Sequence, residues 1–348
     1  MNIDHKYMLR AIELGKKAIS FAAPNPMVGC VIVHNDRIIG EGFTSAYGGP
    51  HAEVNAINSV NDKSILEKAT LYVTLEPCSH FGKTPPCANL IAKHKIPKVV
   101  IGLVDPNTKV SGAGIKKLRD SGSVVVVGVL EDECREHHKR FLTFQEKKRP
   151  YVILKWAESQ DGFIAPDKIK RDEAPQPYWI TNSISRQLVH KWRSEEMAIL
   201  VGTNTVFADN PKLNVRSWKG RSSIRVVLDR ELKIPIEFFI YDGSVKTIVV
   251  TESKSHFSKE NTIFEFAEFG ANLAASICEI LYKHNINSLL VEGGQQTLQT
   301  FINEDIWDEA YIFKGENSFE AGIAAPTVSG CIVAKQKILE DGLTLLTK

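Results

Sequence analysis

The chain has 348 residues, of which 43% are hydrophobic and 24% charged, and its formal net charge is +2. This length predicts two domains, or three small ones, with real hydrophobic cores, and the small net charge argues against a nucleic-acid-binding surface. No stretch reaches the ~18 apolar residues of a membrane span, no secretory signal is recognised at the N-terminus, and six scattered cysteines indicate a reducing cytoplasm rather than a disulfide framework.

The first 145 residues alternate between helical and extended patterns. The predicted elements are a helix over 8–18, a hairpin over 30–42, a helix over 51–60, a strand over 69–78, a helix over 87–94, a strand over 98–105, a helix over 114–122 and a strand over 123–130. Several of these strands are wholly apolar, which is typical of a partly parallel sheet covered on both faces. The pattern predicts an α/β domain.

A basic, proline-containing segment over 144–150 predicts a linker, so we place the domain boundary between residues 146 and 147. A second α/β pattern follows it. Its predicted elements are a strand over 151–159, a helix over 184–194, a strand over 198–206 that leads into a turn, strands over 224–229 and 247–251, an amphipathic helix over 271–286 and a strand over 288–294. The second domain is therefore expected over 147–348.

A metal site is indicated by HAEVNAI, which begins at His51, and by TLEPCSHFGKTPPC, which ends at Cys87. His51, Cys78 and Cys87 are three ligands of the kinds that zinc prefers, and a catalytic zinc keeps its fourth position for water. Glu53 is not needed as a ligand and is predicted to be the catalytic residue that moves protons between that water and a substrate. His80, inside the loop, is expected to contact substrate rather than to compete as a ligand.

These stretches closely resemble the deaminase domain of the bifunctional deaminase/reductase family of riboflavin biosynthesis. This family differs from other deaminases by an eight-residue insert between the two cysteines. PNPMVGCVIV (24–33) and DPNTKVSGAGI (105–115) also match, so the resemblance covers nearly all of residues 1–145. It implies a cytidine-deaminase-like three-layer α/β fold and zinc-dependent hydrolytic deamination of a diaminopyrimidinone ribosyl phosphate. The implied substrate-binding residues are Asn25, His80, Lys83, Thr84, Asp105 and Asn107.

The chain departs from that family at Thr44, where a histidine is usual in the segment before HAE. A hydroxyl can donate a hydrogen bond in place of an imidazole, but it cannot carry the charge. We therefore expect this difference to affect substrate affinity more than chemistry.

The second half resembles the reductase half of the same family, which has a dihydrofolate-reductase-like α/β fold. The matching stretches are LKWAESQDGFIA (154–165), WIT (179–181), VGTNTVFADNPKLNVR (201–216) and VEGG (291–294). The resemblance implies hydride transfer from NADPH to C1′ of the ribosyl group, which gives a ribityl chain. The implied substrate-binding residues are Lys155, Arg193, Leu213, Arg216 and Glu292, and the implied cofactor-binding residues are Ala157, Trp179, Thr205, Asp209, Arg230, Gly293 and Gly294.

Physical reasons support several of these assignments. Gly293 and Gly294 would let backbone amides approach a pyrophosphate at the start of a helix, although the chain has no GxGxxG fingerprint there. Guanidinium groups match phosphate oxygens, so Arg193 and Arg216 are expected at the substrate phosphate and Arg230 at the adenosine 2′-phosphate. Pro177 stands where the family commonly has a serine, so one hydrogen-bond donor is missing.

Three other readings stay open at this stage. The chain would otherwise be a deaminase of a related nucleotide with a drifted, non-reducing second domain, a binding protein descended from such an enzyme, or a tRNA-editing deaminase. Glu53, which is not needed as a metal ligand but stands beside three ligands, disfavours the binding protein. The long loop between the cysteines disfavours the tRNA-editing deaminase. We expect a cytoplasmic enzyme that acts on a small molecule, binds neither nucleic acid nor membranes, and forms a homo-oligomer, as a dimer or tetramer.

Overall fold

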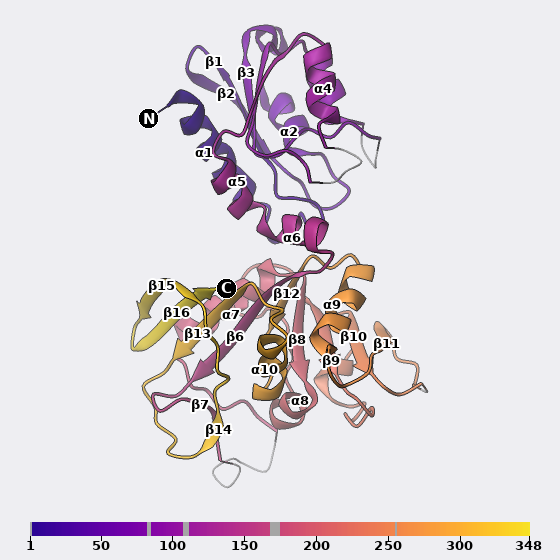
Figure 1. Ribbon diagram of the computed structural model, residues 1–348, viewed down its shortest axis with the longest axis vertical. Helices are drawn as coiled ribbons and strands as arrows, with labels where there is room; N and C mark the ends of the chain where they lie inside the picture. The colour runs from indigo at the N-terminus through magenta and orange to yellow at the C-terminus, as the bar shows by residue number, and fades with distance from the viewer. Residues whose placement is uncertain (1, 82–84, 107–110, 168–174, 255) are drawn as a thin grey trace. The chain divides into compact units, whose positions relative to one another are not determined.

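The structure is a computed structural model that describes residues 2–81, 85–106, 111–167, 175–254 and 256–348. The chain divides into two compact units, Met1–Lys148 and Arg149–Lys348, which we call unit 1 and unit 2 (Figure 1). The predicted boundary after residue 146 falls two positions before this division. In the described part of the chain, no helix is both long and apolar enough to cross a membrane.

Unit 1 is built on a five-stranded sheet. Its strands are β1 (Gly29–His34), β2 (Arg37–Phe43), β3 (Thr70–Val73), β4 (Lys98–Ile101) and β5 (Val124–Val127). Its helices are α1 (Ile3–Lys16), α2 (Ala52–Ser59), the 3₁₀ helix η1 (Lys63–Lys68), α3 (Cys87–Lys93), α4 (Ala113–Asp120), α5 (Glu131–His137) and α6 (Lys139–Lys147). The strand order is β2-β1-β3-β4-β5, with β1 antiparallel to both neighbours and β3, β4 and β5 parallel.

Two glycines let helices lie directly on this sheet. A Cβ on Gly29 would come within 1.8 Å of the Ala11 carbonyl oxygen in α1, and a Cβ on Gly42 within 2.3 Å of the Ala56 nitrogen in α2. Gly29 pairs in register with Phe43, the neighbour of Gly42, and successive residues of a strand face opposite sides. The helices α1 and α2 therefore cover opposite faces, and unit 1 is the three-layer α/β domain that was predicted.

Unit 2 holds a nine-stranded sheet in the order β11-β10-β9-β8-β12-β6-β13-β16-β15 and a small sheet of β14 and β7. The strands are β6 (Tyr151–Glu158), β7 (Phe163–Pro166), β8 (Ala198–Gly202), β9 (Ile224–Leu228), β10 (Thr247–Thr251), β11 (Thr262–Phe266), β12 (Ser288–Val291), β13 (Glu309–Lys314), β14 (Gly322–Ala324), β15 (Cys331–Ile338) and β16 (Asp341–Thr347). The helices are α7 (Ser183–Glu195), α8 (Thr203–Asp209), the 3₁₀ helix η3 (Phe239–Tyr241), α9 (Leu273–Lys283) and α10 (Gln295–Asn303).

Seven neighbouring strands of the large sheet, from β11 to β13, run parallel, and β16 and β15 continue it antiparallel. Alternate residues of β6 point to its two faces. Val152 and Leu154 pack in the apolar cluster that contains residues of α9 and α10, whereas Tyr151 and Ile153 pack with residues of α7. Helices thus cover both faces, and the predicted second α/β domain is confirmed.

The centre of this sheet is a topological switch point. The strands β6 and β8 come early in unit 2, and β12, which follows much later, lies between them and parallel to both. In open α/β sheets, ligands bind outside the carboxyl ends of the strands at the point where the strand order reverses. The carboxyl ends of β6, β8 and β12 are therefore where a ligand site is expected.

Several predicted elements are corrected by the structure. Residues 144–147, predicted to belong to a linker, form the last turn of α6, and the helix ends at Lys148 with left-handed backbone. The basic residues lie around a buried stretch, Leu142 to Phe144, and they obscured its helical spacing. The segment after Gly202, predicted as more strand and a turn, is the helix α8. The strands β13 to β16 were missed altogether.

Two buried histidines in unit 1 predict acid sensitivity. The ring Nε2 of His137 bonds to the Met27 carbonyl oxygen at 2.6 Å, and that of His138 bonds to the Thr74 hydroxyl at 3.0 Å. Burial lowers the pKa of His137 from 6.5 to about 4 and places that of His138 well below its usual range. Below pH 6.5 both histidines bind protons in the unfolded chain, whereas in the folded unit they stay neutral to a lower pH.

The stabilisation is therefore complete above pH 6.5 and is lost as the pH falls towards 4, with roughly 3 kcal/mol from His137 alone. Urea denaturation between pH 7 and 4, followed by far-UV circular dichroism, measures this loss. All five tryptophans lie in unit 2, so tryptophan fluorescence reports that unit separately. The variant His137→Gln keeps a donor for the Met27 carbonyl and should show a flatter pH dependence; an unchanged slope would contradict the prediction.

Candidate active sites

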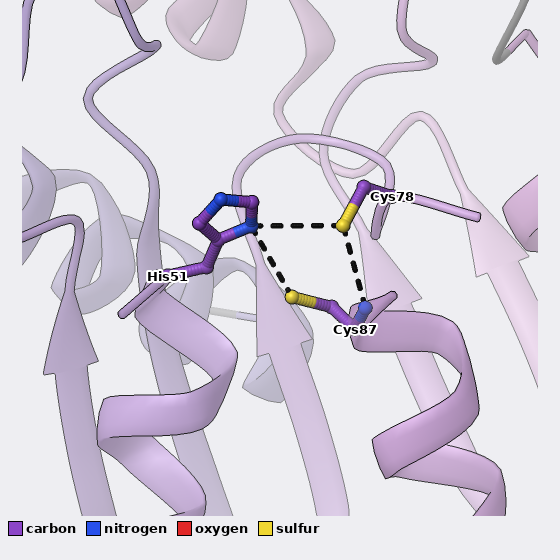
Figure 2. Close-up of side chains that lie close together, drawn as sticks. All are labelled: His51, Cys78 and Cys87. Carbon is purple, nitrogen blue, oxygen red and sulfur yellow. Dashed lines mark hydrogen bonds between the residues drawn. The ribbon is translucent and has the colours of Figure 1, made fainter. Parts of the chain in front are cut away.

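The three residues predicted to bind metal lie together in unit 1. The Nδ1 atom of His51 is 3.6 Å from the Sγ of Cys78 and 3.4 Å from the Sγ of Cys87, and all three ligand atoms lie within 4.8 Å of one another. They come from the residue before α2, the loop after β3 and the first residue of α3, and their side chains point towards a common centre (Figure 2).

This spacing fits a zinc ion. Four tetrahedral ligands at zinc bond lengths of about 2.0 Å to nitrogen and 2.3 Å to sulfur place nitrogen and sulfur about 3.6 Å apart. The backbone N–H of Cys87 donates to the Cys78 Sγ at 3.3 Å, and hydrogen bonds from Cys87 and His51 lower the pKa of the Cys78 thiol. A thiolate is the form that ligates metal, so the lowered pKa of Cys78 and the spacing of the three ligand atoms both suit a cation.

Glu53 stands in the first turn of α2, two residues after His51, and its side chain is buried. Burial raises the pKa of this carboxyl group to about 7, and the negative charge of Cys78 adds to the rise. A carboxyl group with a pKa near neutrality can both accept and return a proton. Its place beside the three ligand atoms is the arrangement that a proton-transfer residue needs.

The structure describes three of the six residues implied to bind the deaminase substrate. Asn25 is half-buried, Asp105 is half-buried with its backbone N–H 3.3 Å from a Glu76 carboxylate oxygen, and His80 is exposed. The remaining three, Lys83, Thr84 and Asn107, lie outside the described residues. Among the described residues, the hydrogen bonds of the three metal ligands do not include His80.

The Thr44 hydroxyl bonds to the backbone of its own unit. Its side chain is buried, its hydroxyl accepts a hydrogen bond from the Val28 N–H at 3.0 Å, and it donates to the Pro26 carbonyl oxygen at 3.0 Å. Both bonds hold the backbone that directly follows Asn25. Thr44 therefore acts on the conformation of this segment, so any effect of the substitution on substrate affinity is expected through Asn25.

Glu76 was missed by the sequence reasoning. This buried carboxylate, two residues before Cys78, accepts four backbone hydrogen bonds. Its Oε1 atom accepts the N–H groups of Gly114 and Ile115 at 2.9 and 3.2 Å, and its Oε2 atom accepts those of Asp105 and Gly112 at 3.3 and 3.0 Å. It thus ties the segment around Asp105 and the start of α4 to the metal-ligand loop. The feature of the sequence that could have indicated this role is an acidic residue at the end of an apolar, strand-like stretch.

The nearly isosteric variant Glu76→Gln should weaken substrate binding without loss of metal. Its NH₂ group would face two N–H donors, and each unsatisfied buried donor costs about 1–3 kcal/mol. We expect KM for deamination to rise about tenfold, which corresponds to about 1.4 kcal/mol. Ammonia release and zinc content are the measurements, and Glu67→Gln, an exposed acid of the same unit, is the matched control. Loss of zinc with unchanged KM would contradict this role.

Unit 2 has a cleft of about 1460 Å³ at the switch point of its sheet. It is lined at the ends of β6, β8 and β12 and along α7, α8 and the start of α10. Of the twelve residues implied to bind substrate or cofactor in this unit, all but Gly293 line the cleft. The lining residues are Lys155, Ala157, Trp179, Arg193, Thr205, Asp209, Leu213, Arg216, Arg230, Glu292 and Gly294.

The most enclosed charges of the cleft form one network. The Nε and Nη2 atoms of Arg193 donate to the two carboxylate oxygens of Glu292, each at 2.7 Å, and the Nζ of Lys155 is 3.6 Å from the same carboxylate. Burial alone would raise the pKa of Glu292, but the two cations outweigh it and hold the pKa at about 2. Burial lowers the pKa of Lys155, and Glu292 opposes that shift.

This network limits the part that Arg193 can play in ligand binding. Arg193 uses Nε and Nη2 for Glu292, so only Nη1 remains for a substrate phosphate. Arg216 is exposed at the cleft, and its Nη1 donates to the Asn214 side-chain oxygen at 2.9 Å. Arg230 is also exposed, with its Nε bonded to Glu252 at 2.6 Å. Arg216 and Arg230 are therefore the more accessible cations of the cleft.

Gly293 and Gly294 have different structural roles. A Cβ on Gly293 would come within 2.4 Å of the Val201 Cα atom, so this glycine is required by the packing of β12 against β8. Gly294 caps α10 with φ +58 and lines the cleft next to the Thr205 hydroxyl. Only Gly294 has the place predicted for a backbone that approaches a ligand.

Trp179 is 54% exposed at the cleft, and the Arg186 guanidinium lies 4.8 Å from its ring centre. This cation–π contact covers one face of the indole. Pro177 lines the same part of the cleft, so the position where the family commonly has a serine does lie at the site. Arg186 was not predicted from the sequence.

Family models match both units. The model described as "RibD C-terminal domain" matches residues 150–315, and the model described as "Cytidine and deoxycytidylate deaminase zinc-binding region" matches residues 1–103. The first match includes all of the cleft residues named above, and the second includes the three metal-ligand residues. The likeness therefore includes both candidate sites.

Similar proteins and solved structures cover nearly the whole chain. Riboflavin biosynthesis protein RibD of Aquifex aeolicus is 40% identical over 89% of this chain and 86% of its own length, and that of Synechocystis sp. is 39% identical over 94% and 88%. The crystal structure of the diaminohydroxyphosphoribosylaminopyrimidine deaminase/5-amino-6-(5-phosphoribosylamino)uracil reductase of Thermotoga maritima is 38% identical, with a TM-score of 0.89 over 99% of this chain and 98% of that one. Acinetobacter baumannii RibD, form 1, is 31% identical, with a TM-score of 0.88 over 99% and 98%.

Proposed function

The chain belongs to the RibD family of bifunctional deaminase/reductases of riboflavin biosynthesis, and from this membership we propose which of its residues carry each reaction. Unit 1 is assigned the deamination of 2,5-diamino-6-ribosylamino-pyrimidinone 5′-phosphate, and unit 2 the reduction of the ribosyl group to ribityl. The observation that carries the proposal is the pairing of a zinc-type ligand group and a buried acid in unit 1 with a lined cleft in unit 2.

In the deaminase unit, we assign metal binding to His51, Cys78 and Cys87. Zinc held there would supply the Lewis acidity that makes water a nucleophile near neutral pH. Glu53 accepts a proton from the attacking water and delivers it to the ring nitrogen. It then moves the proton of the newly added hydroxyl group to the amine, so that the C–N bond breaks, ammonia departs and the carbonyl group forms at C2. Asn25 and Asp105 are assigned to substrate binding, together with His80, Lys83, Thr84 and Asn107 as implied by the family.

In the reductase unit, NADPH would supply the hydride. The ammonium group of Lys155 is held by Glu292 at the carboxyl end of β6, where it can stabilise the oxygen that gains negative charge as C1′ is reduced. Arg193 fixes that carboxylate from the other side. Arg216 is assigned to the substrate phosphate, since its guanidinium is exposed at the cleft.

The cofactor is assigned to the part of the cleft between β8, β9 and β12. Thr205 and Gly294 face each other there, at the starts of α8 and α10. Arg230 follows β9 with its side chain 55% exposed, which supports a contact with an adenosine 2′-phosphate and hence a preference for NADPH over NADH. Replacing Arg230 by Ala should raise KM for NADPH far more than KM for NADH.

A coupled assay tests the assignment of both units. The zinc-loaded chain is incubated with the diaminopyrimidinone ribosyl phosphate, with and without NADPH, and ammonia release and absorbance at 340 nm are followed together. The expected result is ammonia in both mixtures and NADPH oxidation only in the complete one. Ammonia without NADPH oxidation would leave unit 2 as a drifted domain, a reading that the matches over both units do not favour.

The remaining expectations concern the molecule in the cell. All six cysteines are free thiols, which supports a reducing, cytoplasmic setting. We keep the expectation of a homo-oligomer without nucleic-acid or membrane partners, and sedimentation of the purified chain tests the oligomeric part.

A further inference from the structure

Among the fully buried side chains of the described residues, Arg225 is the largest, and it is 0% exposed. It stands in β9 between the apolar residues Ile224 and Val226. A guanidinium is always charged and has five N–H donors, so burial requires partners for all of them. Its partners therefore show what the side chain holds in place.

The guanidinium joins two chain segments, one that precedes β9 in the sequence and one that follows it. Its Nε and Nη2 atoms both donate to the Lys212 carbonyl oxygen, at 3.0 and 2.7 Å. Its Nη1 atom donates to the Phe239 carbonyl oxygen at 3.0 Å and to the Asp242 carboxylate at 2.7 Å, and Nη2 also reaches the Ser244 hydroxyl at 3.2 Å. One side chain thus fixes residues 212 and 239–244 relative to each other.

Two further contacts link the same segments near the cleft. The Asn210 side-chain oxygen accepts the Phe239 N–H at 2.9 Å, and the Lys212 ammonium lies 4.6 Å from the centre of the Phe239 ring. Residues 210–213 and Phe239 line the cleft, whereas Arg225 lies behind them. Leu213, in this wall, has left-handed backbone with φ 50, which is unfavourable for leucine and needs support from its surroundings.

We infer that Arg225 is a positioning residue of the reductase, which holds the cleft wall of residues 210–213 in its binding geometry through the Lys212 carbonyl group and the segment 239–244. The inference rests on the proposed reductase function of unit 2 and on Leu213, a cleft residue that the family resemblance implies in substrate binding. Arg225 touches neither ligand, so it acts through the wall. Because small displacements of binding groups reduce substrate binding strongly, the effect falls on KM.

The test uses Arg225→Lys in the full chain. Lysine keeps the charge, but its single nitrogen cannot bridge the Lys212 and Phe239 carbonyl groups as the planar fork does. We expect KM for 5-amino-6-(5-phosphoribosylamino)uracil, measured by NADPH oxidation at saturating NADPH, to rise about tenfold with a smaller change in kcat. Ammonia release by unit 1 of the same preparation is the internal reference and should not change.

Arg149→Lys is the matched control. Arg149 is another enclosed arginine of unit 2, bonded to both oxygens of Asp308 at 2.6 and 2.8 Å, and neither residue lines the cleft. Its replacement should lower the stability of unit 2, seen by tryptophan fluorescence, and leave KM unchanged. A second variant, Asp242→Asn, keeps Arg225 but removes its charged partner, and KM should rise about threefold in the same direction.

A purely structural role predicts a different result. Arg225→Lys and Asp242→Asn would then lower apparent kcat in proportion to the folded fraction and leave KM at the wild-type value, as in Arg149→Lys; that outcome overturns the inference while the reductase assignment stands. A wild-type chain that releases ammonia but oxidises no NADPH overturns the reductase assignment and the inference with it.

Discussion

Replacing Glu53 by Gln should lower kcat for ammonia release by about 10²–10⁴-fold, the range that general acid–base catalysis contributes. The amide has nearly the same shape as the carboxyl group but can neither accept nor return the proton. Glu53 is buried beside the ligand atoms of His51 and Cys87. The described metal-ligand group contains no other carboxyl group that could transfer the proton in its place. Zinc content, measured by atomic absorption, should stay at the wild-type value.

Two comparisons make this result specific to unit 1. NADPH oxidation with 5-amino-6-(5-phosphoribosylamino)uracil, the deaminated intermediate, should be unaffected, because it needs only unit 2. The exposed acid Glu67 provides the matched variant Glu67→Gln, which should keep full deaminase activity. Residual ammonia release above about one tenth of the wild-type rate in Glu53→Gln would rule out Glu53 as the proton-transfer residue.

The second large effect is expected for Glu292→Gln in the reductase. Arg193 and Lys155 would lose the carboxylate that both contact, and two enclosed cations would face each other without an anion. Removal of one partner from a buried ion pair costs about 3–5 kcal/mol. We expect unit 2 to unfold at a lower urea concentration, seen by tryptophan fluorescence, and NADPH oxidation to fall by about 100-fold or more, the scale of a lost electrostatic contact at a reacting group.

A double-variant cycle separates stability from catalysis. If Glu292→Gln acts through the unpaired Arg193, then Arg193→Met in the same chain should recover part of the lost stability, because one of the two enclosed, unpaired cations is removed. NADPH oxidation should not recover, since Lys155 still lacks its partner. Full recovery of both would show that Glu292 serves only to neutralise Arg193.

The sequence predicted the zinc-type group because its residue types, order and spacing are specific, and the ligand atoms of His51, Cys78 and Cys87 do lie together. It could not predict the pairing of Arg193 with Glu292, because these residues are 99 positions apart and meet only when β12 inserts beside β6. Their individual motifs indicated two separate ligand contacts, whereas the structure makes them partners.

Other differences have local physical causes. Glu76 and Arg225 are charges enclosed by backbone groups, and the composition of an apolar strand gives no sign of which carbonyl or N–H groups surround such a side chain. Thr44 stands at the expected place in the chain, but its hydroxyl is used by the Pro26 and Val28 backbone. The segment after Gly202, predicted as the end of a strand and a turn, forms α8; the sequence missed this helix because seven residues are too few for a clear periodic pattern.

The order of strands in unit 2 also bears on synthesis of the chain. The two sheet neighbours of β6 are β12 and β13, and Glu158 at the end of β6 precedes Ser288 at the start of β12 by 130 positions. On the ribosome, β6 therefore emerges long before either neighbour, while unit 1 is already complete. Such distant pairings slow folding, so we expect unit 2 to complete its sheet only after β12 and β13 have been synthesised, at a stage when unit 1 can already fold.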